Sequence, residues 1–283
     1  MKVPEMFHVK HWLSGRAGAA ALALAVLAAC SSPEEIAAKT GTAASAKPPA
    51  PPKPPAPAPS KVTFEDTASQ GEATRDFPYS WPAKATAIPV LAAHLTAERD
   101  RLLAEQKAEW QEALVELAAD ECGACTNRSY EKTWDVVADL PRFLSLSAAW
   151  NAYSGGAHGN YAWDALVWDR EAMTAFDPKT MFTSPAALQG ALGGAWCKAL
   201  TAERIKRLGE YADDGIFPCP PIADLTVLVG SSDRKSFNRI GLIAAPYVAG
   251  SYAEGEYEVT LKVTPKVLAA VKPRYRAAFA VGK

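Results

Sequence analysis

The sequence predicts an α+β fold, in which antiparallel sheets pack against one long N-terminal helix and a second helical segment. Two observations predict this class. Strand-like alternation and helical periodicity occur in separated runs along the chain, and the expected strands between residues 130 and 169 are joined by connections short enough for antiparallel pairing. With 283 residues, of which 49% are hydrophobic and 22% charged, the chain is long enough for a sizeable core.

Residues 1–29 are predicted to be a lipoprotein signal peptide. A basic start precedes an uncharged run over residues 17–29, and these 13 residues are too few to span a bilayer, which takes about 20. The run ends in LAAC at residues 27–30. This ending resembles the bacterial lipobox, which implies that Cys30 receives a diacylglyceryl group. An ordinary secretory signal with a chance cysteine is the alternative.

The expected address is the cell envelope. Ser31, not Asp, follows the cysteine, and in a Gram-negative envelope the lipoprotein-sorting pattern then implies the outer membrane, facing the periplasm. Residues 30–61 are expected to form the acylated cysteine and a Pro/Ala-rich tether, because a run without a hydrophobic face builds no core. The folded region is divided into an N-terminal part, 62–177, and a C-terminal part, 178–283.

The N-terminal part begins with extended segments over residues 62–81, and Pro89 then opens a helix that continues to about Ala119. Its expected buried stripe consists of apolar residues at helical spacing: Leu91, Leu95, Leu102, Trp110, Leu114 and Leu117. Three strands follow, which we place at 130–138, 143–153 and 160–169. In the second of these strands apolar and polar residues alternate, which predicts one buried and one wet face.

The C-terminal part begins with a helix over residues 184–208, because Ser184 is a suitable N-cap and Pro185 fits the first helical position. Strand patterns return at 225–229 and 240–244. The clearest alternation is at 256–263, where Tyr257, Val259, Leu261 and Val263 are expected to share the buried face.

The mature chain has four cysteines besides Cys30, an even number in an oxidising compartment. We expect the pairs Cys122–Cys125 and Cys197–Cys219, and the second closes a 23-residue loop, which contributes about 3 kcal/mol in the chain-entropy model. A redox role for Cys122–Cys125 is less favoured, since the pair follows a helix C-terminus that opposes thiolate formation. A four-cysteine zinc site is a further alternative.

The most unusual stretch is YSGGAHGN at residues 153–160. Its closely spaced glycines predict positive φ angles or close backbone approach, so a structural turn that holds His158 is the first interpretation. A binding surface is the second. In the third, His158 acts as a general base with Asp164 or Asp169.

This stretch and a later one resemble the bacterial RsiV-like domain, that is, domain of unknown function 3298 with its DUF4163-type N-terminal part. The first signature contains Tyr153, Gly155, Gly156, His158 and Gly159, and the second, IAAPYVAG at residues 243–250, contains Pro246 and Tyr247. The likeness covers roughly residues 62–281. It implies an α+β envelope module used for binding, since members include the extracytoplasmic part of a sigma-factor inhibitor that recognises lysozyme.

We therefore expect a non-enzymatic envelope lipoprotein that binds a lysozyme-like muramidase or peptidoglycan. A small envelope hydrolase that uses His158 is the alternative, and a purely structural protein is a third. The net charge of −1 argues against nucleic-acid binding, and with four His in the whole chain we expect no metal and no cofactor. Four aromatic residues are candidates for binding, although each also fits a core position: Trp163, Trp168, Tyr247 and Tyr252.

Overall fold

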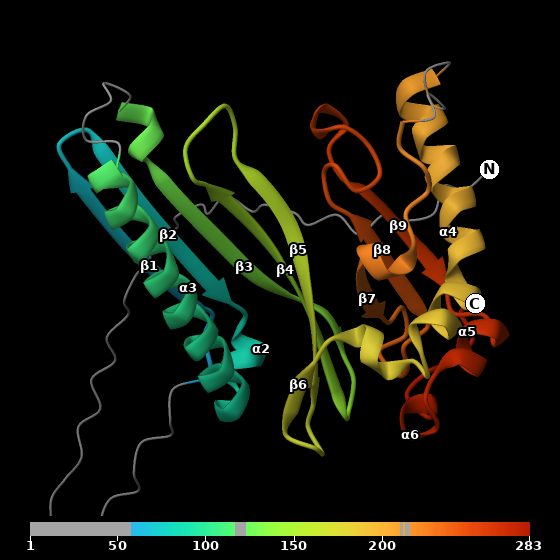
Figure 1. The fold of residues 1–283 in the computed structure, drawn as a ribbon. Helices are drawn as coiled ribbons and strands as arrows, with labels where there is room; N and C mark the ends of the chain where they lie inside the picture. Colours follow the sequence, from blue (N-terminus) through green and yellow to red (C-terminus); the bar gives the residue numbers. More distant parts are fainter. Residues whose placement is uncertain (1–57, 117–122, 210–211, 213–215) are drawn as a thin grey trace, which may run out of the picture. The chain divides into compact units, whose positions relative to one another are not determined.

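A computed structural model describes residues 58–116, 123–209, 212 and 216–283. The expected signal peptide, Cys30, the tether before residue 58 and Cys122 lie outside the described residues. Residues 57–283 form one unit, and its two sheets and main helices are drawn in Figure 1. The expected α+β class is confirmed.

The larger sheet has six strands, which follow one another in space in their sequence order. They are β1 Val62–Gln70, β2 Ala73–Trp81, β3 Arg128–Asp139, β4 Phe143–Tyr153, β5 Asn160–Asp169 and β6 Thr174–Phe176. Every neighbouring pair is antiparallel except β2–β3, which is parallel. The helices α2 (Ala83–Thr86) and α3 (Pro89–Glu116) lie between these two parallel strands in the sequence, as a parallel connection requires.

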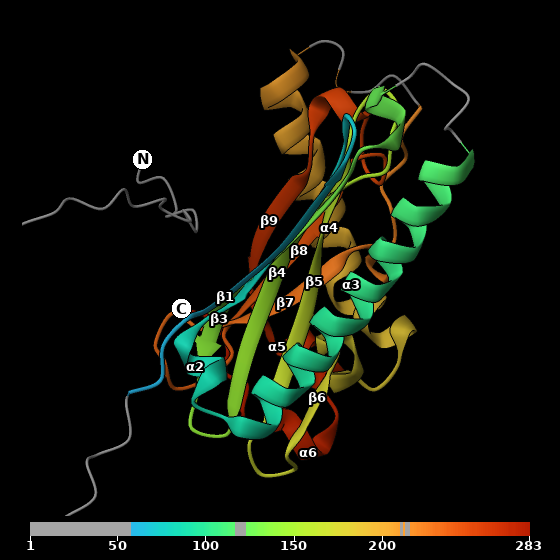
Figure 2. The same cartoon turned by 90° about the vertical axis from the view of Figure 1, so that its left-hand side faces the viewer.

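The helix α3 covers one face of this sheet (Figure 2). Of the expected stripe, Leu91, Leu95 and Trp110 are buried, whereas Leu102 and Leu114 are partly buried and Leu117 lies outside the described residues. The helix also buries Gln106, which was not expected. Its amide donates to the carbonyl of Asp76 and its oxygen accepts from Arg75, so the polar groups of this side chain are satisfied below the helix.

The smaller sheet has three antiparallel strands, β7 Thr226–Gly230, β8 Arg239–Ala244 and β9 Tyr257–Lys262. Over residues 257–263 the expected alternation is confirmed, since Glu258, Thr260 and Lys262 are exposed. Of the expected buried face, Tyr257 and Val263 are buried, whereas Val259 and Leu261 are only partly buried. The helix α4, Pro185–Leu208, packs on this sheet, and the hydroxyl of Ser184 accepts from the amide of Ala187 as the predicted N-cap. The short helices α5, Pro265–Ala270, and α6, Pro273–Arg276, end the fold.

Two hydrophobic clusters stabilise the unit. One lies between α3 and the larger sheet and contains Phe77, Leu91 and Trp168. The other joins the two sheets, since Phe143 of the larger sheet packs in the same cluster as Val227 and Leu242 of the smaller sheet. The two parts of the folded region therefore share a core across residue 177. No helix among the described residues is long and apolar enough to cross a membrane.

The expected bridge Cys197–Cys219 is confirmed, with its Cα atoms 5.6 Å apart. Close to it, the indole of Trp196 is fully buried and donates to the carbonyl of Pro220 over 3.0 Å. The bridge and this hydrogen bond fix the segment after α4 to the helix. For the other expected pair, Cys125 is disulfide-bonded, and Cys122 lies outside the described residues.

Candidate functional site

The loop between β4 and β5 contains the glycine-rich signature, and it requires glycine for two separate reasons. Gly155 and Gly156 have φ angles of +89° and +95°, which L-residues with a side chain adopt only under strain. At Gly155 a Cβ atom would also lie 2.7 Å from the carbonyl oxygen of Cys125, whereas at Gly156 the same atom would meet open space. The loop is closed by Tyr153, whose hydroxyl donates to the Gly156 carbonyl.

The second signature forms a β-turn between β8 and β9. The amide of Val248 donates to the carbonyl of Ala245, with Pro246 at the second position and Tyr247 at the third. Tyr247 has a φ of +69°, a conformation that this position of a type II turn requires and that glycine normally supplies. Its side chain is nevertheless 54% exposed. The turn thus holds a large aromatic ring in solvent at the cost of backbone strain.

The two signatures meet in space. The imidazole of His158 stacks on the ring of Tyr252 with the centroids 3.9 Å apart, and its Nε2 lies 3.3 Å from the Tyr247 hydroxyl. The rings of Tyr247 and Tyr252 are 5.7 Å apart. We call the three residues His158, Tyr247 and Tyr252 the aromatic surface. The β4–β5 and β8–β9 connections that supply them lie at the same end of the two sheets (Figure 1).

The segment that holds Tyr252 is fixed by its own hydrogen bonds. Ser251 and Glu254 form a capping box around the short helix η5, Tyr252–Glu254. Burial alone would raise the pKa of the Glu254 carboxyl, but hydrogen bonds from Tyr257 and Ser251 outweigh burial and lower it. Burial, followed by the bond to this carboxylate, raises the pKa of Tyr257 to about 12. Both groups therefore keep their hydrogen-bonding forms at neutral pH.

His158 is placed with neutral partners and not with the two expected aspartates. Its Nδ1 lies 2.8 Å from the carbonyl oxygen of Gly159. Asp164 pairs with Lys132, while Asp169 is buried and accepts two hydrogen bonds from the guanidinium of Arg142. The hydrolase alternative requires one of these aspartates beside the imidazole. In the structure both instead form ion pairs, Asp164 with Lys132 and Asp169 with Arg142.

The four aromatic candidates separate in the structure. Trp168 is 1% exposed and belongs to the core below α3, so it is a core residue and not part of a binding surface. Tyr247 is exposed and Tyr252 is partly buried. Trp163 is also partly buried, and it lines a cavity that the sequence did not predict.

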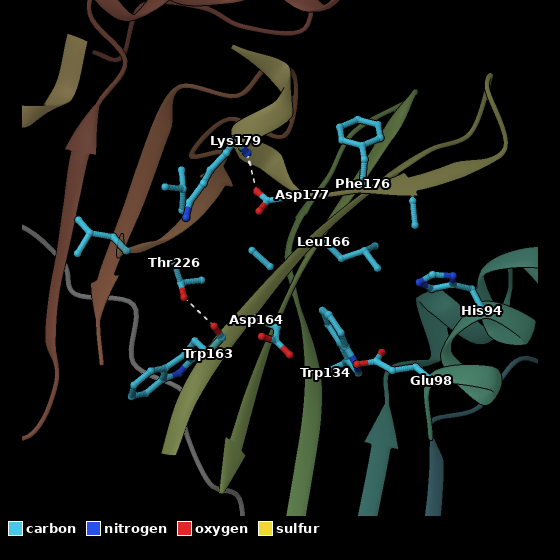
Figure 3. A pocket seen from close by; sticks show the side chains of 14 residues that line it. His94, Glu98, Trp134, Trp163, Asp164, Leu166, Phe176, Asp177, Lys179 and Thr226 are labelled. Atoms are coloured by element: carbon cyan, nitrogen blue, oxygen red, sulfur yellow. Dashed lines mark hydrogen bonds between the residues drawn. The ribbon is translucent and has the colours of Figure 1, made fainter. Parts of the chain in front are cut away.

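This cavity, the β5 pocket, has a volume of about 500 Å³. It lies at the open edge of β5, because β6 pairs only with residues 167–169 and leaves the preceding part of the strand without a neighbour on that side in the six-stranded sheet. Side chains reach it from several elements: His94 and Glu98 of α3, Trp134 of β3, Trp163 and Asp164 of β5, and Lys179 of η2, Pro178–Met181. Figure 3 shows these side chains, with the ring of Trp163 on the side of β5 opposite to His94 and Glu98.

Beside the pocket lies a charged network centred on Lys132, a side chain that is only 3% exposed. Its ammonium contacts the carboxylates of Glu98 and Asp164, and it lies 4.8 Å from the centre of the Trp134 ring. Glu98 also accepts from the hydroxyl of Tyr79 over 3.0 Å. Burial, and then the negative charge of Glu98, raises the pKa of Tyr79, which keeps this phenol protonated as the donor.

The comparisons place this fold among solved structures. No protein-family description and no curated protein matches the sequence. A solved member of the DUF3298 family from Bacteroides fragilis is similar in structure, with a TM-score of 0.51 and 15% identity, over 79% of this chain and 92% of that one. A DUF3298 family protein from Pseudomonas aeruginosa PAO1 is 18% identical over 79% of this chain and 97% of that one, with a TM-score of 0.46.

At such identities the likeness to the Bacteroides protein shows the fold alone, and the expected DUF3298 fold is confirmed at that level. Within the described part of the chain, no group of three or more His, Cys, Asp or Glu side chains is arranged to hold a metal ion. The sequence had singled out His158 and Tyr247 from separate motifs, and the structure brings them together. It had not singled out His94, Glu98 or Trp134, because only tertiary packing gathers them at one cavity.

Proposed function

We propose that the chain is a non-enzymatic, RsiV-like cell-envelope lipoprotein whose folded region binds an envelope protein or glycan through the aromatic surface. The observation that carries this proposal is Tyr247, an exposed ring held in a turn where glycine would be free of strain. Large aromatic rings with a polar tip are the side chains that dominate the energetics of binding surfaces. The candidate ligands are a lysozyme-like muramidase and peptidoglycan.

The supporting hydrogen bonds favour binding by a preformed surface. The capping box of Ser251 and Glu254 holds the η5 helix, and the guanidinium of Arg207 donates to the carbonyls of Glu254 and Glu256. Tyr252 is thereby placed under His158 before any ligand arrives. Such preorganisation lowers the entropy lost on binding.

Replacement of Tyr247 by Gly separates binding from folding. Glycine relieves the strain of the positive φ, so the melting temperature is expected to stay the same or rise, while removal of the ring weakens ligand binding about tenfold or more. Binding is measured by immobilising a lysozyme-like muramidase, and by co-sedimentation with insoluble peptidoglycan. Arg234→Gly is the matched control, because Arg234 has a φ of +59° in the loop at the opposite end of β8.

Unchanged binding of both ligands by Tyr247→Gly would count against the aromatic surface as the binding site. The hydrolase alternative is tested in parallel with peptidoglycan fragments and simple esters, where we expect no turnover. Turnover that disappears in His158→Ala at an unchanged melting temperature would replace the proposed function by that alternative.

The anchor is a proposal that rests on the sequence LAAC at residues 27–30. Cys30→Ser removes the thiol that accepts the lipid, so the protein is expected to lose fatty-acid label and to leave the membrane fraction. Metabolic labelling with a radioactive fatty acid, followed by fractionation, measures both. Label that persists in Cys30→Ser would contradict the proposal.

A further inference from the structure

The C-terminal segment carries an uneven share of the positive charge of the chain. The whole chain has 30 Lys and Arg against 31 Asp and Glu, but residues 259–283 contain no acidic residue. The same segment contains six basic residues: Lys262, Lys266, Lys272, Arg274, Arg276 and Lys283. Five of them are exposed and Lys272 is partly buried, and none of the six forms an ion pair with any described residue. Their charge is therefore presented to solvent.

Tertiary packing adds further cations to this segment. The connection between β7 and β8 carries two exposed basic side chains, those of Arg234 and Lys235. Arg239, at the start of β8, lies opposite Lys262 in the β8–β9 ladder, and its guanidinium donates to the carbonyl of Lys283. Basic residues from two parts of the sequence thus meet at one end of the smaller sheet.

This end of the sheet lies away from the aromatic surface. We call residues 231–239 and 262–283 the basic end. Tyr247 belongs to the β8–β9 connection, whereas the residues of the basic end lie at or beyond the opposite ends of these two strands. Figure 1 shows the β8–β9 connection at the top of the smaller sheet and α5 and α6 in the lower half.

The tether also joins the folded unit away from the aromatic surface. Val62, the first residue of β1, pairs with Trp81, the last residue of β2. Because β3 runs parallel to β2, it ends on that same side at Asp139, and β4 then leads back to the loop that holds His158. The basic end and the entry of the tether therefore both lie opposite the aromatic surface.

The chemistry of the basic end fits an anionic lipid surface. Clustered cations without ion pairs attract such a surface electrostatically. The acidic side chain within the basic end, that of Asp233, accepts from the amides of Lys235 and Ser236 in its own loop. Val281 is 47% exposed among the cations. A lipid surface offers hydrocarbon to such a side chain, which a soluble polyanion does not.

We propose that the basic end docks the folded unit on an anionic phospholipid surface, with the aromatic surface directed away from the membrane. The choice of a membrane as the anionic partner rests on the proposed lipid anchor at Cys30, whereas the docking contact itself needs no acyl chain. The tether keeps the unit close to the surface, so a weak electrostatic attraction is enough to orient it. The aromatic surface then stays accessible to its ligand.

The test is co-sedimentation of residues 57–283 with large phospholipid vesicles. This part is one compact unit that contains both hydrophobic clusters and both sheets, so it folds on its own, and it lacks Cys30. Vesicles of phosphatidylcholine with about 30 mol% phosphatidylglycerol are expected to bind it about tenfold more tightly, or better, than phosphatidylcholine alone. Binding is expected to weaken steeply as the salt concentration rises from about 0.05 M to about 0.5 M.

The triple variant Lys262→Gln/Lys266→Gln/Arg274→Gln removes three exposed cations of the basic end. Each Lys or Arg near an anionic surface contributes about fivefold to the affinity, so this variant is expected to bind the anionic vesicles about 100-fold more weakly. Should it fail to fold, Lys266→Gln alone tests the same surface, because an exposed side chain without an ion pair is removed at little cost to folding. The single variant should bind about fivefold more weakly.

The matched control is Arg101→Gln/Lys198→Gln/Lys206→Gln. It changes the net charge by the same amount, but its three exposed residues lie on α3 and α4. Because charges away from the contact are screened by salt, the control is expected to bind the anionic vesicles within about threefold of the unchanged protein.

Four results would overturn the proposal. They are equal binding to vesicles with and without phosphatidylglycerol, unchanged affinity of a folded triple variant or of Lys266→Gln, an equal loss in the control, and displacement of more than about half of the bound protein by polygalacturonate at equal charge concentration. The last would assign the basic end to a soluble polyanion.

The two surfaces are tested independently. Tyr247→Gly is expected to leave vesicle binding unchanged, and the triple variant is expected to leave the binding of muramidase and peptidoglycan unchanged. A failure of the aromatic surface is therefore distinguished from a failure of the basic end. A failure of the anchor is also distinguished, because residues 57–283 carry no Cys30 and the anchor is tested by fatty-acid labelling.

Discussion

Replacement of Lys132 by Met is expected to lower the free energy of unfolding by about 3–5 kcal/mol. The Lys132 side chain is 3% exposed, and its ammonium contacts two carboxylates, of which Glu98 has a side chain that is only 18% exposed. Methionine fills a similar volume but leaves both carboxylates without a counter-charge, and an unpaired charge beside a core is costly because water solvates it poorly there. Chemical denaturation monitored by tryptophan fluorescence measures the loss.

A double-mutant cycle shows whether charge and not packing causes that loss. Glu98→Gln in the Lys132→Met background removes the less exposed of the two carboxylates, so the double variant is expected to recover part of the stability lost by Lys132→Met alone. Asp164, with a side chain that is 46% exposed, is expected to contribute less to the cycle. If the double variant is less stable than Lys132→Met by the full cost of Glu98→Gln alone, the two residues are independent and the explanation fails.

The second large effect is expected at Gly155. Its replacement by Ala adds a Cβ atom at a φ of +89° and 2.7 Å from the Cys125 carbonyl oxygen. This oxygen cannot easily move away, because the guanidinium of Arg128, a residue that is only 8% exposed, donates to it over 2.8 Å. Strain of about 1–2 kcal/mol and the overlap together give a loss of about 3 kcal/mol.

Gly156→Ala is the matched comparison for this effect. Its φ of +95° imposes similar strain, but the added Cβ atom meets nothing within 4 Å. Its expected loss is therefore the strain alone, about 1–2 kcal/mol. Thermal unfolding of Gly155→Ala and Gly156→Ala under identical conditions measures the difference between the two stability losses. Equal losses would show that the close approach of Gly155 to the Cys125 carbonyl has no energetic consequence.

Much of the fold follows from local patterns. The alternation in β9 and the N-cap at Ser184 each depend on a few neighbouring residues, and each was confirmed. The pairing of Cys197 with Cys219 was predicted from the even number of cysteines and was also confirmed. The antiparallel order of β3, β4 and β5 was likewise predictable from their short connections. The parallel pairing of β2 with β3 was not, because nothing in either strand specifies which edge the chain returns to after α3.

The stripe on α3 shows the limit of periodicity. Helical spacing correctly placed Leu91 and Leu95 in the core, but it also favoured Leu102 and Leu114, which are only partly buried, and missed Gln106, which is buried. The side chain of Gln106 is buried since Arg75 and the backbone of Asp76 offer it partners. Those partners come from β2, some 30 residues earlier, and they leave no signal in the helix itself.

The candidate sites likewise combine features that are local in the sequence with contacts that depend on tertiary packing. The sequence by itself predicted positive φ angles or close backbone approach at Gly155 and Gly156, since closely spaced glycines are a local signal of backbone conformation. Only the tertiary structure decided that Tyr247 and His158 touch, that Asp164 serves Lys132 and not His158, and that an open strand edge leaves a cavity beside Trp163. Contacts between residues far apart in the chain depend on how whole sheets pack, and no local pattern encodes that packing.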